Sequence, residues 1–451
     1  SAKETAITSL TPDLVLAGGN THTPSGAAIA DVAVRGGKII GIGHFPTAGV
    51  RIDCKGLDIL PGVIDSQVHF REPGLEHKED LETGSMAAVL GGVTAVFEMP
   101  NTTPNTDSAS RVADKLSRAH HRMYCDHAFY VGATDANVSE LADLERIPGT
   151  AGIKVFMGAS TGDLLVAEDR SLARILASGS RRVAIHAEDE ERLQSRLQTR
   201  VEGDPSSHPV WRDDESAMLA TKRIIKLARR AARPIHILHI STPAEFEYIA
   251  QHRDIATCEV TPQHLTLAGD DAYLKLGTLA QMNPPIRSRA HRDGLWHWLN
   301  QGVPDVIGSD HAPHQLAEKE CAYPRSPSGM PGVQTLLPLM LDHVANGMLS
   351  IERLIEMTST SVQRVFGLVG KGRIALGYDA DFTVVDRNGH FSITEEWLAS
   401  RCGWSPFTGM ELRGRVMGTI VRGHVAMWEN ELSNTTEGEA LRFASALDVQ
   451  E

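Results

Sequence analysis

Residues that commonly bind metal ions stand at or just after the ends of several short apolar segments in this sequence. The set consists of His69, His186, His239 and Asp310. Imidazoles and carboxylates are typical ligands of zinc, so these four positions form a candidate metal site. Lys154 lies inside another apolar segment, where an unmodified ammonium group would be costly to bury.

Each of these residues also has an ordinary structural explanation. A single His at a strand end is most often a hydrogen-bonded structural residue, and a single Lys more often extends its ammonium group to solvent. The Asp-His pair at 310–311 is a common form of turn or cap. The residues nevertheless share one end of successive segments, which chance placement would not produce, so the set as a whole favours a functional site.

The elements that must position these residues are eight short apolar segments of β type that alternate with helical patterns. The segments are 62–65, 93–98, 128–131, 153–156, 183–185, 235–240, 256–260 and 306–307. The helical patterns include 79–90, 107–118 and 214–231. This alternation predicts a (β/α)8 barrel of the α/β class, also called a TIM barrel. The loops that follow the strands carry the chemistry of such barrels, and the candidate residues fall there.

Both ends of the sequence have a different pattern of apolar and polar residues from the middle. Residues 13–61 and the segments 378–386 and 415–425 alternate apolar and polar residues between Gly turns, as short β-strands do. We therefore predict a small β-sandwich domain built from both chain ends. The predicted parts are a first sandwich part at 1–61, the barrel at 62–365, a second sandwich part at 366–430 and a loosely held polar tail at 431–451.

The composition of the 451 residues excludes several classes of protein. The 44 Lys and Arg against 57 Asp and Glu give a net charge of −13, which argues against nucleic-acid binding. No apolar run approaches the ~18 residues of a membrane span, and residues 1–10 lack the pattern of a signal peptide. The five Cys are scattered without a CxxC pair, so we expect a reducing, cytoplasmic location.

Seven short motifs in order resemble the dihydroorotases of the amidohydrolase superfamily, in their class I-like form. They are Asp-x-x-Val-His-Phe-Arg-Glu-Pro-Gly (65–74), Met-Pro-Asn-Thr (99–102), Gly-Ile-Lys-Val-Phe-Met-Gly-Ala-Ser-Thr-Gly (152–162), Ile-His-Ala-Glu (185–188), His-Ile-Leu-His-Ile-Ser-Thr (236–242), Met-Asn-Pro-Pro-Ile-Arg (282–287) and Asp-His-Ala-Pro-His (310–314). Arg71 with Asn101 and Asn283 narrows the resemblance to dihydroorotases, because hydantoinases and dihydropyrimidinases lack the HFREPG motif.

This resemblance implies a site for two zinc ions. His69 and Asp310 would hold one ion, and His186 and His239 would hold the other. Lys154 would be carboxylated on its amine and bridge the two ions as a carbamate, which also accounts for a Lys on a buried strand.

The resemblance also implies a reaction, the reversible closure of N-carbamoyl-L-aspartate to L-dihydroorotate in de novo pyrimidine synthesis. In the hydrolytic direction a metal-bound hydroxide would attack the ring carbonyl, with Asp310 as the proton shuttle. Arg71 would pair with the substrate carboxylate. Asn101 and His314 would complete that pocket, and Asn283 would bind the ring amide.

One position departs from the family pattern, because the first strand of the family reads His-x-His and this chain has Gln67 before Val68 and His69. Three interpretations stay open. Gln67 is a poor ligand at a working site, or one of the two zinc ions is bound weakly, or the protein is a degenerate homologue. We favour a working enzyme, because the other ligands, Arg71 and Asp310 are all present.

Two rival functions follow from the same residues. The first is another cyclic amidohydrolase, such as an allantoinase or a hydantoinase, although Arg71 and Asn101 argue for a substrate with a carboxylate, which allantoin lacks. The second is a non-catalytic homologue that acts as a scaffold or subunit partner. The sequence implies a small-molecule substrate as the partner; it is compatible with a homodimer but does not fix the oligomeric state.

Overall fold

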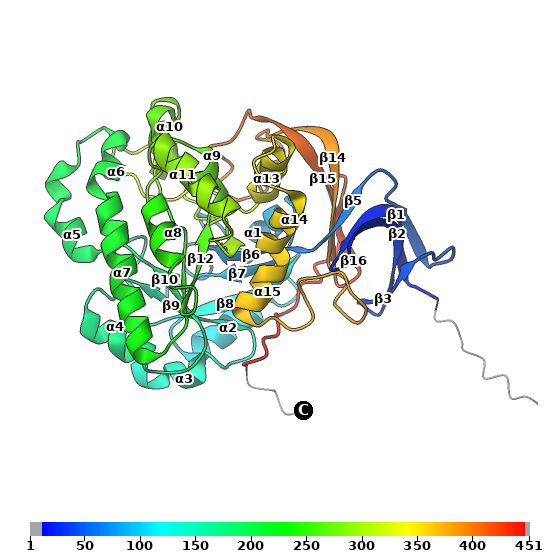
Figure 1. Cartoon of the computed structure of the whole chain (residues 1–451), viewed down its shortest axis with the longest axis horizontal. Coiled ribbons are helices and arrows are strands. Elements are labelled where there is room, and N and C mark those ends of the chain that lie inside the picture. Colours follow the sequence, from blue (N-terminus) through cyan, green and yellow to red (C-terminus); the bar gives the residue numbers. More distant parts are fainter. Residues whose placement is uncertain (1–10, 447–451) are drawn as a thin grey trace, which may run out of the picture.

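The computed structural model describes residues 11–446, which form a parallel barrel with a β domain at its side (Figure 1). The barrel strands pair in chain order without interruption. They are β6 (Val63–Val68), β7 (Val93–Glu98), β8 (Asp126–Gly132), β9 (Thr150–Phe156), β10 (Val183–His186), β11 (Ile235–Ile237), β12 (Ala256–Val260) and β13 (Val306–Ile307). All eight predicted strands are present, which confirms the predicted barrel.

The first and last strands of the barrel approach each other just beyond β13. A parallel bridge joins Val68 to His311, and the backbone N–H of His69 donates to the carbonyl oxygen of His311 at 2.7 Å. This contact brings the loop after β6 beside the loop after β13. His69 and Asp310, far apart in the sequence, therefore become neighbours.

The described residues form fifteen α-helices around the barrel, several of which bury the outer faces of its strands. They are α1 (Leu81–Leu90), α2 (Ala109–Ala119), α3 (Leu141–Leu144), α4 (Asp169–Leu176), α5 (Glu190–Ser195), α6 (His208–Trp211), α7 (Asp214–Ala231), α8 (Pro243–Ile249), α9 (Pro262–Thr266), α10 (Gly269–Leu276), α11 (Arg289–Asn300), α12 (Leu316–Lys319), α13 (Leu336–Ala345), α14 (Ile351–Ile355) and α15 (Ser361–Phe366). Helix α7 begins where the side chain of Asp213 accepts the N–H of Ser216 at 3.0 Å. Residues 11–446 contain no helix with the length and hydropathy of a membrane span.

The two chain ends build the β domain together, as predicted. Its strands are β1 (Leu14–Thr23), β2 (Gly26–Arg35), β3 (Lys38–Gly43), β4 (Val50–Asp53), β5 (Asp58–Pro61), β14 (Phe382–Ser392), β15 (Glu411–Val421), β16 (His424–Trp428) and β17 (Glu431–Leu432). Strand β5 joins the two halves, because it pairs with β1 on one side and with β14 on the other. The result is one sheet of mainly antiparallel strands.

The prediction of a loosely held tail is wrong for residues 438–446, which are bonded to and packed against the barrel. Phe443 is buried, with its ring 5.7 Å from that of Phe97 and 4.7 Å from the guanidinium of Arg181. Leu441 is also buried, so this segment covers the barrel at the end where its strands begin. The segment is polar overall, so the sequence pattern did not reveal that these two apolar side chains are buried. The prediction for 447–451, and that of no signal peptide at 1–10, lie outside the described residues.

Candidate active site

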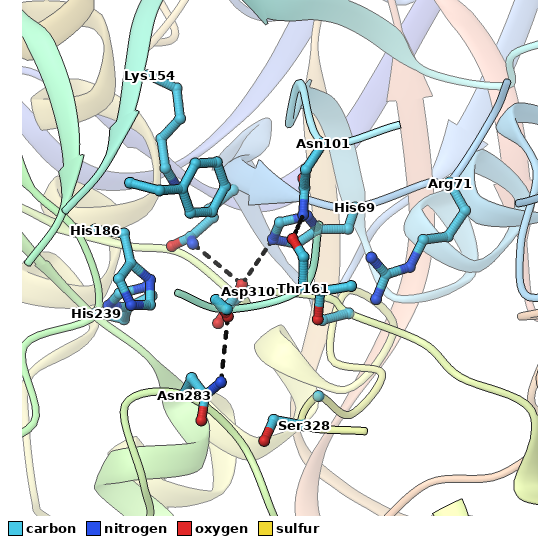
Figure 2. Close-up of a pocket in the computed structure, with 15 residues that line it drawn as sticks. His69, Arg71, Asn101, Lys154, Thr161, His186, His239, Asn283, Asp310 and Ser328 are labelled. Atoms are coloured by element: carbon cyan, nitrogen blue, oxygen red, sulfur yellow. Dashed lines mark hydrogen bonds and ion pairs between the residues drawn. The ribbon is translucent and has the colours of Figure 1, made fainter. Parts of the chain in front are cut away.

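The barrel strands and the loops after them bring nine of the ten predicted residues to one pocket (Figure 2). The predicted residues that line it are Gln67, His69, Arg71, Asn101, Lys154, His186, His239, Asn283 and Asp310. Figure 2 shows His186 and His239 together on one side and Arg71 on the opposite side. His314 is fully buried next to Arg71 and is not among the lining residues.

His69 is held between Asn101 and Asp310. The Nδ2 group of Asn101 donates to the carbonyl oxygen of Thr161 at 2.9 Å, so its Oδ1 accepts the proton on Nδ1 of His69, 2.8 Å away. Burial lowers the pKa of His69 to about 4, so the ring is neutral at pH 7. Its Nε2 then carries a lone pair and lies 3.1 Å from Oδ1 of Asp310. Two facing lone pairs repel each other, and a bound cation would remove this repulsion.

His186 and His239 form a second pair, with ring centroids 4.7 Å apart. Nε2 of His186 donates to Oε1 of Glu188 at 2.8 Å, and Arg212 donates to the same oxygen at 2.6 Å. The proton is thus held on Nε2, and Nδ1 of His186 keeps a lone pair. Nδ1 of His239 is buried without a hydrogen-bond partner among the described residues. A His whose second nitrogen is held by a carboxylate is the usual form of a metal ligand.

Lys154 lies on β9 with 1% of its surface exposed and no carboxylate within ion-pair distance among the described residues. Its Nζ lies 3.5 Å from the sulfur of Met99 and 4.3 Å from the centre of the Phe156 ring. Burial lowers the pKa of Lys154 to about 8, so the neutral amine is more populated than in an exposed Lys. The neutral amine is the form that can take up carbon dioxide as a carbamate.

The donor atoms at the pocket fit a metal centre that includes a modified Lys154. No three His, Cys, Asp or Glu side chains in the described part of the chain form a ligand group by themselves. The two pairs therefore need a further ligand, and the carbamate of Lys154 would supply one to each. Nε2 of Gln67 donates to Oδ1 of Asp310 at 3.1 Å, while Oε1 of Gln67 is buried and has no hydrogen-bond partner in the described part of the chain.

Three residues of the site have a left-handed backbone. The φ angle is 66° at Arg71, 37° at His239 and 48° at Asp310. Residues other than Gly rarely adopt this conformation, and such strain collects at functional sites. At His239 the backbone N–H donates to Oε1 of the buried Glu259 at 3.0 Å, which stabilises the unusual conformation.

Arg71 is a buried cation without an ion-pair partner among the described residues. Its Nε donates to the carbonyl oxygen of Pro313 at 3.1 Å, and its Nη2 lies 3.5 Å from Nε2 of His314. Its Nη1 is buried and has no hydrogen-bond partner within residues 11–446. Burial lowers the pKa of Arg71 to about 10, so it stays charged at neutral pH. A guanidinium in this state at a pocket is suited to a carboxylate ligand.

The two predicted Asn residues are already engaged by the protein. Asn101 bonds His69 and Thr161, as described above, and so positions the first imidazole. Oδ1 of Asn283 accepts a hydrogen bond from Nε2 of His208 at 2.8 Å, and its Nδ2 donates to Oγ of Ser160 at 3.3 Å. Both amides therefore have fixed orientations at the rim of the pocket.

Three residues that support the site were not found from the sequence. Glu188 stands in the same motif as His186. A carboxylate two positions after a candidate metal ligand could have indicated that it holds the imidazole of that ligand, as it does here. Arg212 and Lys78 contact Glu188 and His314, respectively. Neither contact could be predicted from the spacing of residues along the chain, because each contact joins two separate loops.

Comparisons with known proteins place the chain among cyclic-amide hydrolases and their relatives in sequence and fold. The model of the amidohydrolase family matches residues 59–426. A dihydroorotase of Halobacterium salinarum is 37% identical over 418 residues, which cover 92% of this chain and 97% of that protein. An allantoinase of Solibacter usitatus is 36% identical over 453 residues, which cover 95% and 97%. The structure of an L-hydantoinase from Arthrobacter aurescens superposes with a TM-score of 0.91 at 28% identity, covering 96% of this chain and all of that one.

Proposed function

The chain belongs to the amidohydrolase family, and we propose that it interconverts N-carbamoyl-L-aspartate and L-dihydroorotate in de novo pyrimidine synthesis. The observation that carries this proposal is Arg71, a buried cation at the pocket whose Nη1 has no hydrogen-bond partner among residues 11–446. Both proposed reactants have a carboxylate that can pair with it. Dihydroorotases at 35–37% identity over most of the chain support the same assignment.

Arg71 would bind the ring carboxylate and so orient the substrate. On the opposite side of the pocket from Arg71 lie His186 and His239, so the carboxylate and the reacting amide would occupy different ends. Asn283, fixed by His208, would offer its amide to the ring. Holding both ends of a small ring restricts it to one orientation, which is a large part of the rate gain in such sites.

The metal ligands would be His69 with Asp310 and His186 with His239, with the carbamate of Lys154 shared by both ions. Zinc would polarise the ring carbonyl and make water ionisable near neutral pH. In the hydrolytic direction Asp310 would take the proton from the attacking water and then pass it to the leaving ring nitrogen. Gln67, which donates to Oδ1 of Asp310, would keep that carboxylate oriented.

Another cyclic-amide activity is the second candidate, because an allantoinase is among the similar proteins. Allantoin and hydantoin have no carboxylate, so they would leave the buried charge of Arg71 without a partner. Leaving a buried polar group unpaired costs roughly 1–3 kcal/mol, and more for a charged one. This cost favours dihydroorotate over the neutral rings.

The test is a substrate panel with zinc-loaded protein whose metal content has been measured. We expect turnover of dihydroorotate and of carbamoyl-aspartate, and little of allantoin, hydantoin or dihydrouracil. Preferred turnover of a neutral ring would replace the proposal with the second candidate. Zinc-loaded protein that turns over none of the panel would indicate a non-catalytic homologue.

A further inference from the structure

Lys78 contacts the imidazole that lies beside the proposed carboxylate site. Its Nζ lies 2.8 Å from Nδ1 of His314 and 2.7 Å from Oε2 of Glu318 on α12. His314 is fully buried, and its Nε2 lies 2.8 Å from the carbonyl oxygen of Ser328. The ring is thus fixed at both nitrogens, by an ammonium donor on one side and a carbonyl acceptor on the other.

These two contacts select one tautomer of His314. An ammonium group can only donate, so Nδ1 must accept from Lys78. The carbonyl of Ser328 can only accept, so Nε2 must carry the proton. The opposite tautomer would place N–H against N–H at Lys78 and lone pair against lone pair at Ser328. It would gain only a contact with Nη2 of Arg71 at 3.5 Å, which is at the limit for a hydrogen bond.

The doubly protonated ring is excluded by the charges that face it. Arg71 and Lys78 approach from the loop after β6, and Lys319 approaches from α12. The carboxylate in this group is Glu318, which is bonded to Lys78. Burial together with the charges of Arg71, Lys78 and Lys319 holds the pKa of His314 well below its usual range, in keeping with a neutral ring.

A proton on Nε2 has a consequence for Arg71. Because Nε2 then donates, it cannot accept from Nη2 of Arg71, and Nη1 of Arg71 has no partner among the described residues. Both terminal nitrogens of the guanidinium are therefore available to a ligand. We infer that Lys78 is a positioning residue that fixes His314 with its proton on Nε2 and so keeps the fork of Arg71 open for a carboxylate. That this carboxylate belongs to dihydroorotate rests on the proposed function. The tautomer of His314 is independent of the proposed function, because it follows from the contacts with Lys78 and Ser328.

The tautomer is tested directly on the ligand-free wild-type protein by 15N NMR of ring-labelled His. The signals of His314 are those that disappear in the His314→Asn variant. We expect a ring with a protonated Nε2 and an unprotonated Nδ1 across the neutral pH range. A protonated Nδ1, alone or in a doubly protonated ring, would overturn the inference. This measurement needs no substrate, so its result is separate from the success of the proposed function.

The role in binding is tested with the zinc-loaded protein and dihydroorotate. Lys78→Met should raise KM by about tenfold with little change in kcat, the size expected for one lost hydrogen bond to a charged group. Lys78→Arg, which keeps a cationic donor, should restore most of the affinity. Glu318→Gln is the matched control, because it removes the ion pair but leaves the contact with His314, and its KM should stay near that of the wild type. An equal KM effect in Glu318→Gln, or a loss in kcat alone, would refute the role assigned to Lys78.

Discussion

Nε2 of His69 lies 3.1 Å from Oδ1 of Asp310, and the hydrogen bond of His69 to Asn101 places the imidazole proton on the other nitrogen. A lone pair of the neutral ring therefore faces a carboxylate in a buried site. Such an arrangement is unfavourable alone and becomes favourable around a cation. It is the geometric reason to assign these two residues to one metal position.

Gln67→His should increase metal affinity by about tenfold, equivalent to about 1.4 kcal/mol. The reason is that an imidazole is a better zinc ligand than the neutral amide, whose Nε2 is directed to Asp310. Metal content after dialysis against a graded series of chelator concentrations measures the change. Unchanged affinity would remove position 67 from the ligand set.

Lys154→Ala should lower the metal content, because neither His-containing pair forms a complete ligand group without this side chain. We expect less than one zinc per chain, measured by elemental analysis of the purified variant. Circular dichroism would show that the barrel remains folded. Two tightly held zinc ions in this variant would contradict the carbamate bridge.

Glu188→Gln should weaken metal binding by roughly 10–100-fold, the usual effect of losing the carboxylate behind a His ligand. Glu188 accepts hydrogen bonds from both His186 and Arg212, so the neutral amide would release the ring. Zinc titration followed by calorimetry gives the change. Glu190→Gln is the control, since Glu190 contacts the nearby backbone of Ala159 and not His186.

Arg71→Lys should raise KM for dihydroorotate by roughly a hundredfold, because a point charge replaces a planar fork that can bind both carboxylate oxygens. The zinc content should stay the same, since Arg71 lies on the opposite side of the pocket from His186 and His239. Steady-state kinetics with equal metal loading checks both points. An unchanged KM would show that the carboxylate binds elsewhere.

Asp213→Ala should destabilise the fold by about 1 kcal/mol at pH 7, because Asp213 caps α7. Burial opposes ionisation, but hydrogen bonds from Arg192 and Ser216 lower the pKa of Asp213 to about 2. The folded pKa lies below the unfolded value of about 4, so the contribution is complete above pH ~4 and is lost as the pH falls toward 2. Urea unfolding at pH 7 and pH 3 measures the change; Asp214→Ala is the control.

The sequence by itself determined the barrel, the joint β domain of the two chain ends, and nine of the residues that line the pocket. Local patterns decide these features: eight apolar segments must be buried, and the loops after parallel strands meet at one end. The helix predicted at 214–231 also has the observed bounds, because Asp213 is a strong capping residue.

Only the tertiary structure decided how the site residues are held. The positions of the protons on three imidazoles depend on side chains that contact them. These pairs are His69 with Asn101, His186 with Glu188 and His314 with Lys78. Glu188 lies in the loop directly after its imidazole, and the other two side chains come from different loops than their imidazoles. The burial of Phe443 under the barrel depends likewise on Phe97, far away in the sequence. Contacts between separate loops leave no periodic pattern in a single sequence. The closed barrel brings these loops together, so the number of residues between the two partners follows no rule.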